Sequence, residues 1–194
     1  MKLSAFVICC IIGVFAFSGM AQSTFRIENG NIFSGIDAPV FNAEGIRLSG
    51  TNYAAELWGG VASDSLSPTL DFNTNQRVFV SFGTGISAGY FTSTKSMTVF
   101  QVPGNGLAWV QVRAWDTRLG GNYEQVAALE VGGYGESLLL YIRGGDPLGV
   151  PPTLPGSLIG LQSFSLRPIP EPSVWQLSLL GVSALLLRRR KKRR

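Results

Sequence analysis

A strict alternation of side chains runs through residues 107–115, which read LAWVQVRAW. Successive residues of an extended strand point to opposite faces, so Val110, Val112 and Ala114 share one face. The other face receives the four larger or more polar side chains: Trp109, Gln111, Arg113 and Trp115. This pattern predicts a strand whose valine face lies in a hydrophobic core.

Similar stretches recur along residues 22–167, and glycine or proline interrupts them about every 8–12 residues. Further strands are predicted at residues 25–33, 39–41, 53–58, 77–82, 98–102, 138–142 and 158–166. The turn sequence Pro103–Gly106 predicts a hairpin between the strands that flank it. The spacing is typical of an all-β fold, an antiparallel β-sandwich or jelly-roll-like domain.

One segment of this domain has helical character. Residues 122–130 contain good helix formers, with Asn122 as a suitable N-cap and Gly132-Gly133 as a suitable stop. We therefore expect one short helix that crosses an end of the sandwich.

Histidine is absent, and the only cysteines are Cys9 and Cys10. This composition excludes a Ser-His-Asp triad, a Cys-His dyad and a histidine-ligated metal. No two acidic residues lie two positions apart, as an Asp-x-Asp calcium loop requires. We expect no cofactor and no metal site, although a calcium ion held by separated carboxylates stays open, with no residue to assign to it.

The N-terminus has the three parts of a secretory signal peptide over residues 1–21: Lys2, an apolar run and small residues before the break. Cleavage is expected between Ala21 and Gln22. The alternative, an uncleaved anchor, is disfavoured because the run is shorter than the ~20 residues of a membrane span. Export through the secretion translocon would remove both cysteines with the signal, so the mature domain would contain no disulfide.

The C-terminus combines a Pro-rich linker at 168–173, an apolar segment at 174–187 and a basic stop at 188–194. The apolar segment would form a helix of about 21 Å, short of the ~30 Å hydrocarbon core. It could span a membrane by thinning the bilayer or by snorkelling of its basic flank. The basic stop opens with three arginines: Arg188, Arg189 and Arg190. Their charge places this end in the cytoplasm and the preceding domain outside, as the signal peptide also requires.

Pro170, Glu171 and Pro172, followed by the apolar helix and the basic run, resemble a PEP-CTERM sorting signal. The resemblance implies recognition by an exosortase, a membrane-embedded sorting enzyme with a cysteine nucleophile, and cleavage near the Pro-Glu-Pro motif. It also implies a Gram-negative-type bacterium that makes exopolysaccharide, often in biofilms. The protein would be an inner-membrane-anchored precursor and then reach the cell surface or extracellular matrix. The resemblance is confined to the tail and implies nothing about the fold of the body.

The positive net charge of the chain comes from its two ends. Residues 22–167 contain 8 Lys and Arg against 11 Asp and Glu, a net charge of −3. A domain of this charge has no basic face for a phosphate backbone, so nucleic acid is not an expected partner.

The outer face of the 107–115 strand is the candidate binding site. Trp109, Gln111, Arg113 and Trp115 could form a stripe on which sugars stack and hydrogen-bond. The competing interpretation is that both tryptophans fill the core or pack under the predicted helix, with Arg113 stacked between them.

A glycoside hydrolase would need two carboxyls about 5–9 Å apart, and no strand face offers such a pair. Carboxyls could still meet across strands; Asp116 is the best single candidate, although a turn or cap role fits it better. We therefore expect a non-catalytic structural or adhesive protein of the cell surface or matrix, associated with exopolysaccharide. A carbohydrate-binding module and a polysaccharide-modifying enzyme are the alternatives.

Overall fold

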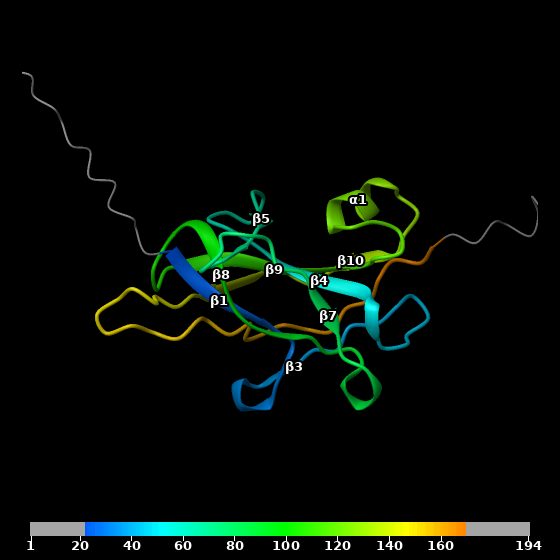
Figure 1. Ribbon diagram of the computed structural model, residues 1–194, viewed down its shortest axis with the longest axis horizontal. Helices are drawn as coiled ribbons and strands as arrows, with labels where there is room; N and C mark the ends of the chain where they lie inside the picture. The colour runs from blue at the N-terminus through cyan, green and yellow to red at the C-terminus, as the bar shows by residue number, and fades with distance from the viewer. Residues whose placement is uncertain (1–21, 170–194) are drawn as a thin grey trace, which may run out of the picture.

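The computed structural model describes residues 22–169, which form the β-rich body of the chain (Figure 1). Gln22 is the first described residue, and Ala21 with the rest of the predicted signal peptide lies outside. The Pro-Glu-Pro motif, the apolar segment and the basic stop, residues 170–194, also lie outside. Among residues 22–169, no helix is long and apolar enough to cross a membrane.

The described residues form antiparallel sheets with one short helix, as predicted. The strands are β1 (Gln22–Glu28), β2 (Gly30–Asn31), β3 (Ile36–Asp37), β4 (Gly50–Gly60), β5 (Ser67–Pro68), β6 (Leu70–Asp71), β7 (Val80–Phe82), β8 (Thr92–Pro103), β9 (Leu107–Asp116), β10 (Tyr134–Glu136) and β11 (Leu140–Arg143). The larger sheet has the order β10-β9-β4-β5, with β11 also paired to β9 and β7 to β4. The smaller sheet has the order β1-β8-β6, and β2 pairs with β3.

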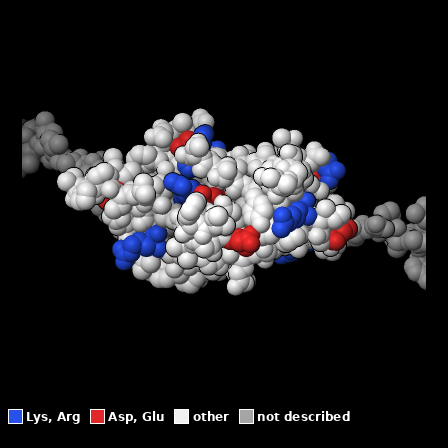
Figure 2. Space-filling model, turned by 90° about the horizontal axis from the view of Figure 1, so that it is seen from below, with Lys and Arg blue, Asp and Glu red and all other residues white. Residues whose placement is uncertain are grey.

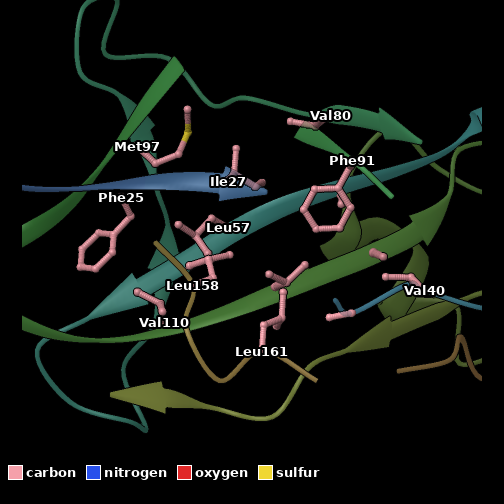
Figure 3. Packing of buried hydrophobic residues seen from close by; sticks show 14 of the residues in the cluster. Phe25, Ile27, Val40, Leu57, Val80, Phe91, Met97, Val110, Leu158 and Leu161 are labelled. Carbon is pink, nitrogen blue, oxygen red and sulfur yellow. The ribbon is translucent and has the colours of Figure 1, made fainter. Parts of the chain in front are cut away.

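The predicted alternation along β9 is confirmed. Val110 and Val112 point into the main core, where they join Leu57 of the neighbouring strand β4 (Figure 3). Phe25 and Ile27 of β1 enter the same core from the smaller sheet. Both sheets therefore bury their apolar faces in one cluster, which holds the domain together without a disulfide.

The Pro103–Gly106 turn forms as predicted, and the Gly106 N–H donates to the Pro103 carbonyl (2.8 Å). The predicted hairpin is nevertheless wrong, because β8 pairs with β1 and β6 whereas β9 pairs with β4, β10 and β11. The chain crosses from one sheet to the other at this turn. Met97 of β8 and Val110 of β9 thereby reach the same core, one from each sheet.

Two further predicted strands are wrong. Residues 39–41 and 158–166 form no strand, and Phe41 makes only isolated bridges, one of them to Ser165. The apolar residues of the second stretch are buried without a ladder: Leu158, Leu161 and Leu166. Their spacing reflects core packing of an irregular segment.

The predicted helix is confirmed as α1 (Tyr123–Ala128). The Asn122 side chain caps it by accepting the N–H of Gln125 (2.9 Å). Gly132 follows with a positive φ of 83°, as expected of a stop after a helix. Val126 packs α1 against the larger sheet, on the face that points away from the main core.

Asp71 fastens the edge strand β6 to β8. Its carboxylate accepts the N–H of Asn73 (3.0 Å) and the hydroxyl of Thr74 (3.1 Å), and the Lys95 ammonium lies 3.3 Å away. The hydrogen bond from Asn73, aided by Lys95 and Thr74, holds the pKa of Asp71 below its ordinary value despite burial.

We expect Asp71→Asn to lower the free energy of unfolding at pH 7 by about 1–3 kcal/mol, because hydrogen bonds to a charged group are lost. The folded pKa lies below the unfolded one, so the stabilisation is present above the ordinary value of 3.8 and lost as the pH falls through the lowered pKa. The difference in free energy of unfolding between wild type and Asp71→Asn should therefore shrink as the solution is acidified below about pH 4. Urea unfolding at pH 7 and pH 3 measures it, with the exposed Asp64→Asn as control. An equal difference at both pH values would contradict this account.

Candidate functional site

The outer face of β9 is largely covered. Trp115 is fully buried, its indole N–H donates to the Gly120 carbonyl (3.2 Å), and its ring meets Phe79 edge-on at 5.3 Å. Tyr134 of β10 and Val126 of α1 complete a second, smaller core around it. Trp115 therefore packs under the helix and is not accessible to a ligand.

Gln111 and Arg113 make their polar contacts within the protein. The Arg113 guanidinium carbon lies 3.8 Å from the ring centroid of Trp58 on β4, and its Nε donates to Gln111 Oε1 (3.0 Å). The Gln111 amide donates to the Ser137 carbonyl (3.0 Å). The expected cation–π pair thus exists, but its aromatic partner comes from β4 rather than from the tryptophans of β9.

Trp109 is the member of the predicted stripe that lies near the surface. Its ring lies 4.8 Å from that of Tyr141 on β11, and Tyr141 is exposed. On its other side the register places Gly60 of β4, which has no side chain. This aromatic pair is the part of the stripe that a sugar ring could reach.

A buried ion pair lies between this face and α1. Arg77 donates to both carboxylate oxygens of Glu56 (2.6 and 2.7 Å) and also to Glu124 of α1 (2.9 Å). Burial raises the pKa of Glu56 although Arg77 opposes it. At Glu124 burial acts in the same direction, but the contacts with Arg77 outweigh it and the pKa is lowered. The network joins the helix to the sheet, and the Arg77 guanidinium donates to both Glu56 and Glu124.

A groove of about 1060 Å³ lies on the side of the molecule where β3 and the turn after β7 project, away from α1 (Figure 1). Two 3₁₀ turns border it, η1 (Ile32–Ser34) and η2 (Gly85–Ser87). Ile32, Phe33 and Ile86 line it and are among the most exposed apolar side chains of the described residues. Figure 2, which views the molecule from this side, shows positive and negative side chains spread over this face, with larger areas of uncharged residues between them.

Asn29 fixes the walls of the groove. This fully buried amide donates to the carbonyls of Ala38 (2.7 Å) and Gly89 (2.8 Å) and accepts the N–H of Phe91 (2.6 Å). One side chain thus ties the end of β1 to the segment after β3 and to the segment before β8.

Polar groups line the groove beside its apolar residues. The Asn31 amide donates to Oε1 of the buried Glu28 (2.8 Å). The Tyr90 hydroxyl donates to Asp37 Oδ1 (2.6 Å), and this hydrogen bond raises the pKa of Tyr90. The groove therefore offers two carboxylates, an amide and a phenol close to exposed apolar side chains.

The sequence interpretation missed the groove because it extended one strand too far. The predicted strand at 25–33 ends at Glu28, and the chain then folds back through β2, η1 and β3. Gly35 follows η1 in the left-handed region at φ 68°, which favours glycine. Apolar Ile32 and Phe33 directly before such a glycine were the available signal, because apolar residues in a turn have no core to enter.

Asp116 is not placed for catalysis. Its carboxylate accepts the backbone N–H of Arg118 (2.9 Å) and pairs with the Arg118 guanidinium, which makes it the turn residue of the alternative interpretation. Among residues 22–169, no cluster of three or more acidic side chains could hold a metal ion.

No family model, curated protein or solved structure matches this chain.

Proposed function

We propose that this chain is an exported, non-catalytic protein of the cell surface or extracellular matrix, with a structural or adhesive role in exopolysaccharide. Its body would be a β-sandwich of the jelly-roll type. A PEP-CTERM-like tail would direct it, with the translocon and an exosortase-type enzyme as its processing partners.

The observation that carries the proposal is how the residues that follow the expected cleavage site are held in the domain. Gln22, the first residue after the expected signal cleavage, pairs with Pro103, and Ser23 and Thr24 are already buried. The Ser23 hydroxyl donates to the Pro103 carbonyl (2.8 Å). Cleavage after Ala21 would therefore release a domain whose first strand is intact.

The C-terminal side of the domain supports the same processing. Leu166 is buried, and the Arg167 N–H donates to the Tyr134 carbonyl (2.8 Å). The Pro-Glu-Pro motif at 170–172 begins three residues after Arg167. Cleavage at the motif would thus keep the buried Leu166 and the hydrogen bond of Arg167 within the released domain.

The test is the mass of the protein in membrane and matrix fractions of an exosortase-bearing host that expresses the tagged chain. We expect a species that starts at Gln22, ends near Pro170–Ser173 and lies outside the membrane. Changing Pro170 and Pro172 to alanine should leave more than about nine-tenths of the protein in the membrane fraction. The ratio of membrane-bound to released protein should rise by about tenfold or more over that of the unchanged chain. Ser173→Ala is the matched control and should be processed normally.

A wild-type species that keeps Arg188–Arg194 in the membrane would contradict the release step. The tail would then be a permanent anchor, and a diffusible matrix role would be wrong.

Carbohydrate binding is the second candidate function. The pair of partly exposed Trp109 and exposed Tyr141 favours it on the larger sheet, although Trp115 cannot contribute. A polysaccharide-modifying activity is the third possibility, and Glu28 and Asp37, two carboxylates that line the same groove, are the candidates for it.

A further inference from the structure

We propose that the groove between η1 and η2 binds a polysaccharide of neutral or amino-bearing sugars. The inference deepens the proposed adhesive role, on which its biological setting rests. The site itself is argued from the groove alone.

The rim of the groove presents apolar surface that nothing in the described chain covers. Phe33 is 98% exposed, Ile86 is 96% exposed and Ile32 is 83% exposed. They stand on two turns at opposite sides of one groove rather than scattered over the surface. Apolar groups held in this way provide contact area for the C–H faces of sugar rings, as in sites that combine apolar walls with a few polar groups.

A largely buried carboxylate, that of Glu28, is among the residues that line the groove. Glu28 is 5% exposed, and its Oε1 accepts the amide of Asn31. For its Oε2, the nearest cation among the described residues is Arg26 Nη1 at 3.9 Å, beyond hydrogen-bond distance. A ligand hydroxyl or ammonium could donate to this oxygen, and a hydrogen bond to a charged acceptor is a strong one.

Charge selects among possible ligands. Glu28 and Asp37 are the charged residues that line the groove, and no Lys or Arg is among its lining residues. Two guanidinium groups lie close to this lining: Arg26 is 3.9 Å from Glu28 Oε2, and Arg47 is 5.3 Å from the centroid of the Tyr90 ring. Polyanionic polysaccharides, nucleic acid and anionic membranes would meet two carboxylates there, which is unfavourable. A purely apolar peptide or lipid would cover the charged carboxylate of Glu28 without donating a hydrogen bond to it, which is unfavourable. Hydroxyl-rich sugars, neutral or bearing amino groups, match both the apolar rim and the acceptors.

The groove is held in shape before any ligand arrives. Asn29 fixes three backbone segments around it, and Tyr90 is held by its hydrogen bond to Asp37. A Cβ at Gly30 would come within 2.8 Å of the Tyr90 ring, so the close approach of β2 to this ring requires glycine. Pre-organisation of this kind reduces the ordering cost of binding.

The experiment is co-sedimentation of the purified full chain with insoluble chitin, chitosan and cellulose. A polyoxyethylene detergent keeps the chain in solution, because an alkyl glycoside would itself offer a sugar to the groove. We expect retention on at least one of these glycans and little on anionic alginate gel. The double change Phe33→Ala and Ile86→Ala should weaken binding by about tenfold or more.

Two control variants distinguish binding at the groove from nonspecific binding. Val150→Ala with Leu154→Ala removes an equally exposed apolar pair from another loop and should leave binding unchanged. Glu28→Gln preserves shape but removes the charge, and should weaken chitosan binding more than chitin binding. Circular dichroism must show the same fold for every variant.

The proposal is overturned if wild-type protein binds none of the three glycans, or if the Phe33 and Ile86 double variant binds as well as wild type. Loss of binding on Trp109→Ala alone would also overturn it and assign the ligand to the larger sheet. Equal sedimentation with neutral phosphatidylcholine vesicles, abolished by the same double variant, would overturn it in favour of a membrane.

Release of reducing ends, abolished by Glu28→Gln, would support the groove as the sugar site and contradict only the non-catalytic part of the proposed function. Correct export without glycan binding would contradict only the proposal that the groove binds sugars. Glycan binding by a protein that stays in the membrane would contradict only the release step of the proposed function.

Discussion

Replacing Trp115 by alanine should lower the free energy of unfolding by about 3–5 kcal/mol. The side chain is fully buried among Val126, Tyr134 and Phe79, so its removal leaves a large cavity. It also orphans the Gly120 carbonyl, which accepts the indole N–H. Urea unfolding followed by far-ultraviolet circular dichroism measures the loss, and the midpoint should fall without a change in slope.

Trp109→Ala is the matched control, since it changes the same residue type on the same face of the same strand. Trp109 is partly exposed and stacks on an exposed tyrosine, so the expected loss is below about 1.5 kcal/mol. Equal losses for the two variants would mean that α1 and β10 do not form a packed second core over Trp115.

These two tryptophans show what the alternation of side chains along a strand can predict and what it cannot. Alternation along β9 predicted correctly which side chains point into the main core, because period 2 is a property of the extended backbone. It could not predict what covers the opposite face. The sequence also predicted α1, yet nothing local in residues 122–130 tells that this helix lies over Trp115 and leaves Trp109 uncovered.

The Pro103–Gly106 turn shows a second limit. Turn chemistry is local, so the reversal was predictable from four residues. Whether the flanking strands pair depends on side chains far along the chain. β8 finds its partner in β1, about 75 residues earlier by the pairing of Thr24 with Thr98, and this contact overrides the nearby hairpin.

Only one side of the groove had a local signal in the sequence, the apolar Ile32 and Phe33 before Gly35; the meeting of its two sides could not be predicted, for the same reason. Its walls come from residues near 30 and near 86, which a single buried amide, Asn29, ties together. An isolated asparagine carries no sequence signature of that role.

Replacing Arg77 by methionine should lower the free energy of unfolding by about 3–5 kcal/mol at pH 7, because Glu56 would be left buried without its cation. The Glu56 side chain is only 2% exposed, and burial already raises its pKa even with Arg77 in place. Loss of Arg77 should raise that pKa further. The helix α1 would also lose its contact through Glu124.

The pH dependence of this loss identifies its cause. A carboxyl whose folded pKa lies above its unfolded pKa destabilises the fold at high pH, and the cost disappears as the pH falls through the folded pKa. The difference in free energy of unfolding between wild type and Arg77→Met should therefore become smaller on acidification, because Glu56 takes up a proton in the folded variant. Urea unfolding at pH 7 and pH 5 measures this.

Two further variants separate the buried charge from lost packing. Arg167→Met breaks the longer pair with Glu136, in which both partners are exposed, and should cost below about 1 kcal/mol. The double change Glu56→Leu with Arg77→Met removes both charges and should recover most of the stability lost in the single variant, since apolar replacements of a buried pair are often neutral. If the double variant is less stable than Arg77→Met alone, the ion pair contributes through its geometry, and the uncompensated charge is not the source of the loss.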